Sequence, residues 1–576
     1  MTTRSIGREA VIVLFSVLTL STLSLLGADS PTVEIKVDQA GYLPQASKVA
    51  IVVSGAAAGD FMLKRAADGA VAYQGKLSAA IPDADSGDSV QAADFTRVKK
   101  PGKYFLDVPG VGRSWTFAIG QDVYSRALYL ATRSFFGQRC GMAVDLGPEF
   151  KGYSYAACHR RGEYHVSSGR SGTAPSVKGW HDAGDYGRYI VNSGITTGTL
   201  LWTWEMFEPK LRKVNLNIPE SGNKTPDFLD EIRWNLDWML TMQDQDGGVW
   251  HKQTTEKFSG FVMPEQDAAP SLVIGTGPDA FKGTCATADF AAVMAIAGRV
   301  YRPFDARYAN QCLEAAKKAW GWAEQHPAVL FRNPAGVATG GYGDRQSGDE
   351  LLWAAAELWR STGEEPYHRY FLAHFAEFRS SIQPDGPPAW AGVAPLALWT
   401  YALGKKKDAE TARAIVDDSL KAADQIVVRS GENGYRISLT SRDYIWGSNS
   451  VAANYGLQLL VGHALRPNAR FVETARDNLH YLLGRNTFSL SWVTQVGENA
   501  FKHPHHRPSG ADNNSEPWPG LLSGGPNRGR QDEVMRKLPA NLPPAKMYLD
   551  EQASYSSNEN AINWNAALVF LLAGVE

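Results

Sequence analysis

The chain has 576 residues, with 58 Lys and Arg against 60 Asp and Glu, which gives a net charge of −2. No long run of one sign occurs, so the charge gives no indication of binding to nucleic acid or to an anionic membrane surface. An apolar content of 44% with 20% charged residues indicates a globular protein with a large core. The 17 Trp and 22 Tyr are numerous, and aromatic side chains outside a core can present flat faces to sugar rings.

Residues 1–28 are typical of a secretory signal peptide. Arg4 and Arg8 form a basic start, residues 11–27 are largely apolar, and Gly27 and Ala28 offer small residues for cleavage. The alternative is an uncleaved membrane anchor, because the apolar stretch is close to the shortest spanning length. We expect cleavage and a secreted or periplasmic protein with no membrane association afterwards.

Residues 31–119 contain short β-prone runs separated by turn residues at near-regular intervals, such as "SKVAIVVSG" and "GKYFLDVPG". This spacing predicts a small antiparallel β-sandwich domain.

Residues 123–576 have a different texture, because apolar residues recur there at helical spacing. About eleven or twelve amphipathic or almost wholly apolar segments predict a single all-α domain in which two rings of helices form an α/α barrel. The long connection at 243–267 is rich in Gly and aromatic residues, and loops of that length in a compact domain are usually functional.

Four cysteines are present: Cys140, Cys158, Cys285 and Cys312. In an exported protein they suggest disulfides. Cys140 and Cys158 could instead join His159 and His181 in the Cys2His2 set that structural zinc prefers, although the spacing matches no short zinc-finger pattern. A zinc site, a Cys140–Cys158 disulfide and buried thiols therefore all remain open from the residues alone.

The stretch "GWHDAGDYGRYI" at 179–190 places Asp182 and Asp185 three residues apart, directly after His181. Aspartates at such a position can cap a helix. Two neighbouring carboxylates can also hold and deprotonate one water molecule. These residues by themselves do not separate the two interpretations.

Two later segments also concentrate polar residues. Residues 494–510 include His503, His505, His506 and Arg507, which could bind a metal, form a solvated basic loop, or donate hydrogen bonds to a neutral polar ligand. Residues 548–569 place Asp550, Glu551 and Glu559 before an apolar helix, where helix capping is the simpler interpretation of Glu559.

The chain contains no phosphate-binding glycine loop in a strand–helix context and no G-x-S-x-G motif. An early aspartate pair, a late glutamate and many aromatic residues are instead the groups needed to cleave a glycosidic bond. One carboxylic acid protonates the leaving oxygen, and a carboxylate on the other face activates water.

Three segments of the chain resemble the motifs of one known enzyme family, and they occur in the same order. "GWHDAGDYGRYI", "WVTQVGENAFKHPHHRPSG" and "YLDEQASYSSNENAINWNAALV" resemble the signature segments of family 9 glycoside hydrolases, which are cellulases. The segment "IKVDQAGYLPQASKVAIV" resembles the immunoglobulin-like domain that precedes the catalytic domain in one bacterial branch of that family. The resemblance covers essentially the whole mature chain and implies an (α/α)6 barrel after an immunoglobulin-like sandwich.

The resemblance also implies roles for individual residues. Asp185 matches the general base, Asp182 helps to hold the same water, and Glu559 matches the general acid. Family members invert the anomeric centre, which predicts roughly 6.5–9.5 Å between the two catalytic carboxyl groups. The matching positions for substrate binding are His505, Arg507, Asp550 and Tyr555.

The same branch of the family carries a structural zinc, and its ligand positions match Cys140, Cys158, His159 and His181. Four protein ligands leave no open position on the metal, so this zinc would brace the neighbouring loop. Calcium is also common in the family. Asp349 and Glu350 offer oxygen ligands, with helix capping as the alternative.

For stacking against sugar rings we expect Trp250, Trp446 and Tyr342, which follow or precede helices in connecting segments. The leading hypothesis is an exported endo-β-1,4-glucanase that acts on a β-1,4-glucan, with a monomer favoured. The alternative is an exo-acting hydrolase of cello-oligosaccharides or glucosaminides with the same fold. A non-catalytic glycan-binding protein would lack the acid or the base, yet both are present.

Overall fold

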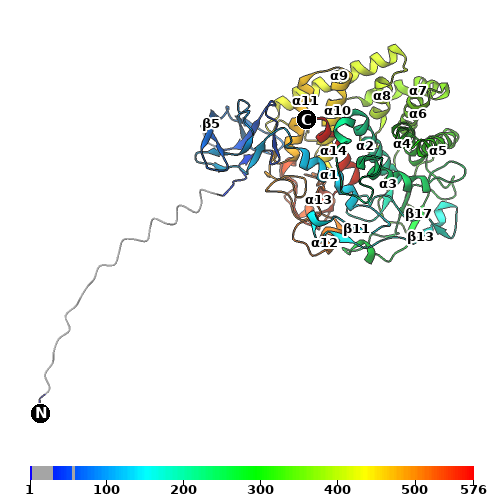
Figure 1. The fold of residues 1–576 in the computed structure, drawn as a ribbon, viewed down its shortest axis with the longest axis horizontal. Helices are drawn as coiled ribbons and strands as arrows, with labels where there is room; N and C mark the ends of the chain where they lie inside the picture. Colours follow the sequence, from blue (N-terminus) through cyan, green and yellow to red (C-terminus); the bar gives the residue numbers. More distant parts are fainter. Residues whose placement is uncertain (3–29, 55–58, 576) are drawn as a thin grey trace.

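The computed structural model describes residues 1–2, 30–54 and 59–575. Apart from its first two residues, the predicted signal peptide lies outside the described residues. Within the described ranges, no helix combines the length and the apolar character needed to cross a bilayer. Figure 1 shows a small strand-rich N-terminal part beside a much larger helical body.

The N-terminal part is the predicted sandwich of two sheets. All pairings are antiparallel except that of the second and tenth strands, which is parallel. The two inner faces enclose a core that includes Phe61, Leu63, Leu106 and Phe117. One sheet has the order β1 (Ile35–Lys36), β3 (Val49–Val53), β7 (Ser89–Asp94), β6 (Ile81–Pro82); the other has the order β2 (Gly41–Tyr42), β10 (Phe117–Ile119), β8 (Gly102–Val108), β4 (Asp60–Arg65), β5 (Val71–Lys76), with β9 (Gly112–Arg113) against β8.

Twelve helices of ten residues or more lie within the described part of the chain, and they form two rings. Six helices each contact the next and close a circle: α2 (Ile190–Leu211), α4 (Thr284–Val300), α6 (Gly348–Thr362), α8 (Ala394–Leu403), α10 (Ser448–Leu465) and α14 (Ile562–Gly574). Six more pack around them: α1 (Ser125–Gly137), α3 (Asp227–Thr241), α5 (Ala306–Gln325), α7 (Glu365–Phe378), α9 (Ala409–Glu432) and α11 (Ala469–Leu482). This is the (α/α)6 arrangement predicted from the helix count.

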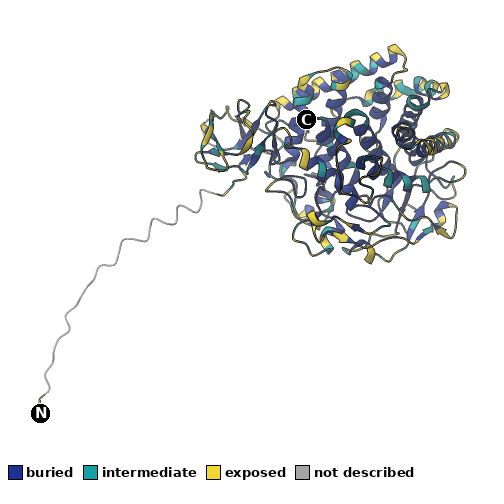
Figure 2. Cartoon of the chain, viewed as in Figure 1, coloured by how far each residue is buried: buried dark blue, intermediate teal, exposed yellow. Residues whose placement is uncertain are grey.

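The composition of the helices explains which ring each one joins. The sequence of α14, "INWNAALVFLLAG", is apolar on almost every side, and a helix of this kind is stable only when it is surrounded by protein. In contrast, α5 and α9 carry charged residues on one face and buried residues on the other. Figure 2 shows this difference as exposed residues along the outer helices and buried residues in the centre.

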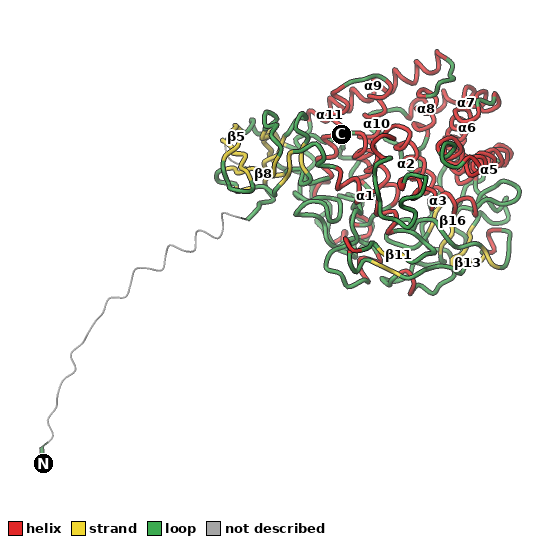
Figure 3. Tube along the Cα trace, viewed as in Figure 1, coloured by secondary structure: helices red, strands yellow, loops and turns green. Residues whose placement is uncertain are grey.

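A five-stranded sheet of very short strands lies at one end of the barrel (Figure 3). The sequence did not predict it. Its strand order is β14 (Thr173–Ala174), β13 (Gly162–Tyr164), β17 (Ser271–Ile274), β16 (Lys252–Thr254), β15 (Arg188–Tyr189). The long connection at 243–267, expected to be a functional loop, therefore contains a strand. Other short elements at the loop ends are β11 (Val144–Asp145), β12 (Ser154–Tyr155), α12 (Arg507–Ala511) and α13 (Tyr555–Asn558).

Polar contacts fix the sandwich against the helical body. The buried carboxylate of Asp38 lies 2.7 Å from Nδ1 of His480 on α11. Lys36 donates to the Thr487 carbonyl at 2.7 Å, and Gln39 donates to the Ser489 carbonyl at 2.9 Å. These groups are removed from water at the contact between the two parts. If the two parts separated, each group would lose its hydrogen-bond partner.

Candidate active site

Asp182 and Asp185 lie on a tight loop that ends where β15 begins. The Asp182 amide donates to the Gly187 carbonyl at 2.9 Å, which closes the loop. A Cβ atom at Gly184 would lie 1.8 Å from the carbonyl oxygen of His505, so position 184 must be glycine. The loop therefore packs directly against the histidine-rich segment that is more than 300 residues away in sequence.

The Asp182 carboxylate is buried and held from two sides. Asn192, in the first turn of α2, donates to Oδ1 at 2.7 Å, and the Tyr342 hydroxyl donates to Oδ2 at 2.6 Å. Burial, together with the negative charge of Asp185, raises the pKa of Asp182 to about 8. Asp182 is thus fixed in position rather than free to move toward a ligand.

Asp185 is only 7% exposed, but it lines the cleft. Its Oδ2 accepts from the Gly187 amide at 2.9 Å and from the Tyr189 hydroxyl at 3.1 Å. Burial and the charge of Asp185 raise the pKa of Tyr189 well above its ordinary value, so this hydroxyl stays a neutral donor. Within the part of the chain that the structure describes, both of these donors contact the same carboxylate oxygen, Oδ2.

Glu559 follows α13 and precedes α14, and it lines the same cleft. The His505 amide donates to the Asn558 carbonyl at 2.9 Å, which places the glutamate beside the histidine segment. Burial raises the pKa of Glu559 well above 4.5, and the charges of Asp185 and Asp182 raise it further. A carboxylic acid that keeps its proton at neutral pH can act as a general acid.

His505 and Arg507 line the cleft, but both have intramolecular partners. Burial lowers the pKa of His505, so its ring is neutral. Its Nδ1 donates to the Gln552 carbonyl at 2.7 Å, which leaves Nε2 without a proton. The Arg507 guanidinium donates to the carbonyls of Gly184 at 2.7 Å and Ser259 at 3.0 Å. Arg507 thereby holds the aspartate loop in place.

Asp550 is not among the residues that line the cleft. Its carboxylate accepts from the backbone amides of Lys502 at 2.7 Å and His503 at 2.8 Å, and from the Asn558 side chain at 3.0 Å. These contacts fix the histidine segment, so the structure gives Asp550 a supporting position instead of direct contact with a ligand.

The cleft has a volume of about 970 Å³ and aromatic walls. Trp446, 40% exposed, and Tyr555 lie with ring centroids 5.3 Å apart. Tyr342 also lines the cleft, with its hydroxyl on Asp182 and its ring against Trp390 at 5.2 Å. The interpretation of Trp250 as a stacking surface is wrong: it is 3% exposed, lies away from the cleft and donates to the Ser168 carbonyl at 2.9 Å.

Several residues of the site were not predicted from the sequence. Tyr189 and Asn192 belong to or directly follow the quoted aspartate stretch, so their proximity in sequence was an available signal. Phe258 lies in the long connection expected to be functional. Asn563 and Trp564 lie within the quoted segment at 548–569, so they too were close to a recognised motif. Trp390, Ile445 and Gln531 come from segments without a distinctive pattern.

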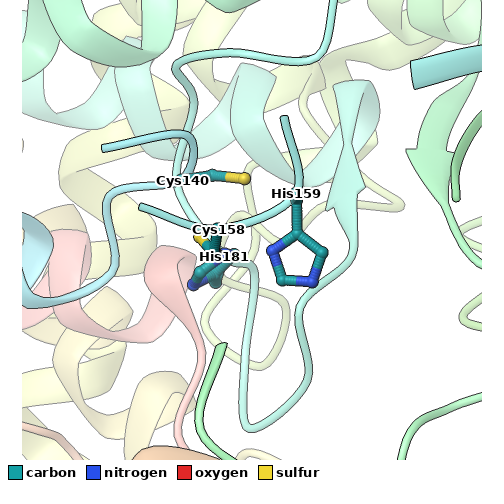
Figure 4. Close-up of side chains that lie close together, drawn as sticks. All are labelled: Cys140, Cys158, His159 and His181. Carbon is teal, nitrogen blue, oxygen red and sulfur yellow. Dashed lines mark hydrogen bonds between the residues drawn. The ribbon is translucent and has the colours of Figure 1, made fainter. Parts of the chain in front are cut away.

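Cys140, Cys158, His159 and His181 lie close together, as Figure 4 shows. His181 directly precedes Asp182 and none of the four lines the cleft, so the group lies behind the aspartate loop. Each offers one ligand atom, and these atoms all lie within 4.8 Å of one another. All four cysteines of the chain are free thiols, so the disulfide alternative is wrong. Nδ1 of His159 is buried without a hydrogen-bond partner, while its Nε2 lies 3.4 Å from Asp267. Two sulfurs and two ring nitrogens in this arrangement fit a tetrahedral metal ion.

Asp349 and Glu350 lie in the first turn of α6 and are buried. Asp349 Oδ2 accepts from the Val393 amide at 3.0 Å, so this side chain does not cap its own helix. Its Oδ1, both oxygens of Glu350 and both oxygens of Asp289 have no hydrogen-bond partner. Burial and the neighbouring carboxylates raise the pKa of Glu350 well above its ordinary value.

Comparison with known protein families gives two matches. Residues 124–572 match glycosyl hydrolase family 9, and residues 30–113 match the cellulase N-terminal immunoglobulin-like domain. Among curated proteins, Endoglucanase D of Acetivibrio thermocellus is 38% identical over 545 residues, which cover 94% of this chain and 83% of that protein. A xyloglucan-specific endo-β-1,4-glucanase of Bacteroides ovatus is 35% identical, over 95% of this chain and 94% of that one.

Solved structures give the same result. A mutant of a thermostable endoglucanase from Alicyclobacillus acidocaldarius has a TM-score of 0.86 at 31% identity, covering 94% of this chain and 99% of that chain. A zinc-binding triple mutant of a family 9 endoglucanase has a TM-score of 0.84 at 35% identity, covering 92% and 99% of the two chains.

Proposed function

The chain belongs to glycosyl hydrolase family 9 and is an endo-1,4-β-glucanase, and we propose that it cleaves β-1,4-glucans by inversion, with Asp185 as general base and Glu559 as general acid. The observation that carries this assignment is that both carboxyl groups line one aromatic-walled cleft and have different hydrogen-bonding surroundings. Asp185 accepts hydrogen bonds from two neutral donors, while burial and neighbouring charges keep the proton on Glu559.

In the proposed reaction, Asp185 takes a proton from a water molecule as that water attacks the anomeric carbon. Glu559 gives its proton to the departing glycosidic oxygen, and the bond between this oxygen and the anomeric carbon breaks. Asp182, fixed by Asn192 and Tyr342, holds the same water in line. This mechanism requires roughly 6.5–9.5 Å between the two catalytic carboxyl groups, to leave room for the water.

The substrate is proposed to stack along the aromatic residues of the cleft. Trp446 has the exposed face that such stacking needs, and Tyr555 lies next to it. His505 presents an unprotonated Nε2 to the cleft, which can accept a hydrogen bond from a sugar hydroxyl.

We assign the Cys2His2 group to structural zinc. Its four donors saturate a tetrahedral ion and leave no position for a reacting water, so the zinc would brace the segment that carries Asp182. Asp349 and Glu350, with Asp289, are proposed to bind calcium. Support comes from their buried oxygens without hydrogen-bond partners, which a hard cation would satisfy.

The protein is further proposed to be exported after cleavage within the first 28 residues and to divide into an immunoglobulin-like domain at 31–119 and a catalytic domain at 123–576. The strand β10 ends at Ile119 and the helix α1 begins at Ser125, which supports this division.

A viscosity assay tests the function. Carboxymethylcellulose should lose viscosity rapidly with little release of reducing ends, whereas release of short products without viscosity loss would indicate exo action. Because the general acid contributes about 10²–10⁴-fold, Glu559→Gln should reduce turnover by that factor while substrate binding is retained. Near-normal turnover of this variant would contradict the assignment, and no hydrolysis of any β-1,4-glucan by the wild type would contradict the function.

A further inference from the structure

Two consecutive residues outside the recognised segments reach the loop that carries Tyr342. His251 and Lys252 come at the start of β16, which pairs with β15 so that Lys252 lies opposite Tyr189. Their side chains contact successive backbone carbonyls, those of Gly340 and Gly341. Tyr342 is the next residue, and its hydroxyl donates to Asp182 at 2.6 Å.

Lys252 is buried, and no ion pair with a carboxylate is found for it among the described residues. It is 0% exposed, and its ammonium donates to the Gly340 carbonyl and to Asn333 Oδ1, both at 2.7 Å, and reaches the Thr339 carbonyl at 3.3 Å. A buried ammonium with only neutral partners is costly to maintain, and burial lowers the pKa of Lys252 to about 7. An apolar side chain could fill the same space but could not donate to these three acceptors. The hydrogen bonds to the acceptors are therefore the reason for an amino group at this position.

His251 acts on the next carbonyl. Burial lowers its pKa to about 3, so the ring is neutral. Its Nε2 lies 2.7 Å from the Gly341 carbonyl oxygen, which can only accept, so Nε2 carries the proton. The ring stacks on Phe331 with a centroid distance of 3.6 Å and an interplanar angle of 5°, which prevents rotation away from the loop.

The residue that follows these two carbonyls has an unusual backbone. Tyr342 has a φ of 44°, in the left-handed region that side-chain-bearing residues seldom adopt. Such a conformation persists only where the surroundings impose it. Here the two fixed carbonyls impose it from the N-terminal side, and the rings of Tyr189 and Trp390, at 5.0 Å and 5.2 Å, hold the Tyr342 side chain.

We propose that His251 and Lys252 are positioning residues for hydrolysis: they fix the two carbonyls before Tyr342 and thereby hold its hydroxyl against Asp182. This inference rests on the proposed function, because it assumes that Asp182 aligns the water used by Asp185. Neither residue lines the cleft. Their effect should therefore fall on turnover and spare substrate binding.

A double-mutant cycle of Lys252→Met and Tyr342→Phe tests this chain of contacts on the full-length enzyme. A small displacement of a catalytic group can cost about 100-fold in rate, so each single variant should lower kcat by about 10–100-fold with KM changed less than about threefold. If Lys252 acts through Tyr342, the double variant should be no slower than the slower single variant.

Lys48 provides a matched control in the N-terminal sandwich. It is also 0% exposed, and its ammonium donates to the carbonyls of Pro44 at 2.9 Å and Ala46 at 2.8 Å. Lys48→Met should lower Tm comparably to Lys252→Met but leave the kcat of the folded protein unchanged.

Multiplied losses in the double variant would overturn the inference, as would a Lys252→Met enzyme whose kcat is normal per folded molecule. If Lys252→Met does not fold, the pair His251→Gln and His251→Leu answers the same question. Only Gln keeps an N–H group for the Gly341 carbonyl, so equal kcat losses in the two would contradict the proposal. A failure of the proposed function is distinct, because it would appear as an active Glu559→Gln enzyme.

Discussion

His181 and Asp182 are neighbours in the chain, yet they serve two regions that satisfy their polar groups in opposite ways. Behind the loop, the Cys2His2 group is buried, and four ligand atoms gather within 4.8 Å. In front of it, Asp182 and Asp185 are held by neutral N–H and O–H donors beside a cleft of about 970 Å³.

This difference between the Cys2His2 group and the aspartate pair explains how one short loop can be both rigid and reactive. Four protein ligands fill every position on a tetrahedral metal ion. Such a group leaves no position for a reacting water and contributes to stability instead. A carboxyl pair held by neutral donors is fixed in position beside the cleft, where it can hold a water molecule. Changes behind the loop should therefore alter stability and metal content, and changes in front of it should alter turnover.

The largest effect is expected from Asp185→Gly. Loss of the base should lower kcat by about 10²–10⁴-fold, with metal content and Tm close to those of the wild type. Added azide should restore part of the activity by attacking in place of the activated water. Glu559→Gln serves as the control, because it keeps the base and should not respond to azide in this way. Near-normal turnover of Asp185→Gly would contradict the proposed difference between the two sides of the loop.

Removal of a ligand behind the loop should act on stability. Cys158→Ser should lose the bound metal and lower Tm by roughly 10 °C, measured by metal analysis and thermal unfolding, because metal-binding energy contributes to folding. Cys312→Ser is the matched control, since Cys312 is equally buried but outside the group. Loss of activity in Cys158→Ser without a fall in Tm would contradict a structural role.

A smaller effect is expected at Asp267, which accepts from His159 on the far side of the ring. Carboxylates in this position orient a metal-bound histidine, and their loss typically weakens metal binding 10–100-fold. Asp267→Ala should therefore lower metal affinity by that factor in a competition with a chelator, and Asp267→Asn, which keeps an oxygen acceptor, by less. Unchanged affinity in both variants would show that His159 needs no such partner.

The smallest effect concerns the pH dependence of stability. Because the pKa of Glu559 is raised in the folded state, the folded protein retains a proton that the unfolded chain releases above pH 4.5. Stability from this group is therefore lost as pH rises from about 4.5 towards the folded-state pKa. Glu559→Gln cannot titrate, so its Tm should exceed that of the wild type by a few °C at pH 8 and match it near pH 4. A constant Tm difference across this range would contradict the raised pKa.

The helices and the catalytic groups were largely predictable from the sequence. A helix such as α14 is apolar on almost all sides, and α5 repeats its apolar residues at helical spacing, so the ring that each joins follows from local composition. Glu559 and Asp185 were assigned through motifs of several consecutive residues, whose order along the chain made the family recognisable.

The small sheet beside the cleft was not predictable in the same way. Its strands have two to four residues, too few to show an alternating pattern. They are defined by pairing between segments up to about 100 residues apart, such as β13 with β17. Lys252 belongs to this sheet and His251 directly precedes its strand, and nothing near them in sequence connects them to Tyr342.

By itself, the sequence determined the two-part architecture, the family and the two carboxyl groups proposed as catalytic, because helical periodicity and contiguous motifs are local properties. Only the tertiary structure decided what each aromatic or acidic residue contacts. Trp250 and Trp446 look alike in sequence, but one is buried with its N–H group on Ser168 and the other is exposed in the cleft. Tyr342 and Asp550 likewise became supports for Asp182 and for the histidine segment, because their partners lie 160 and 47–48 residues away.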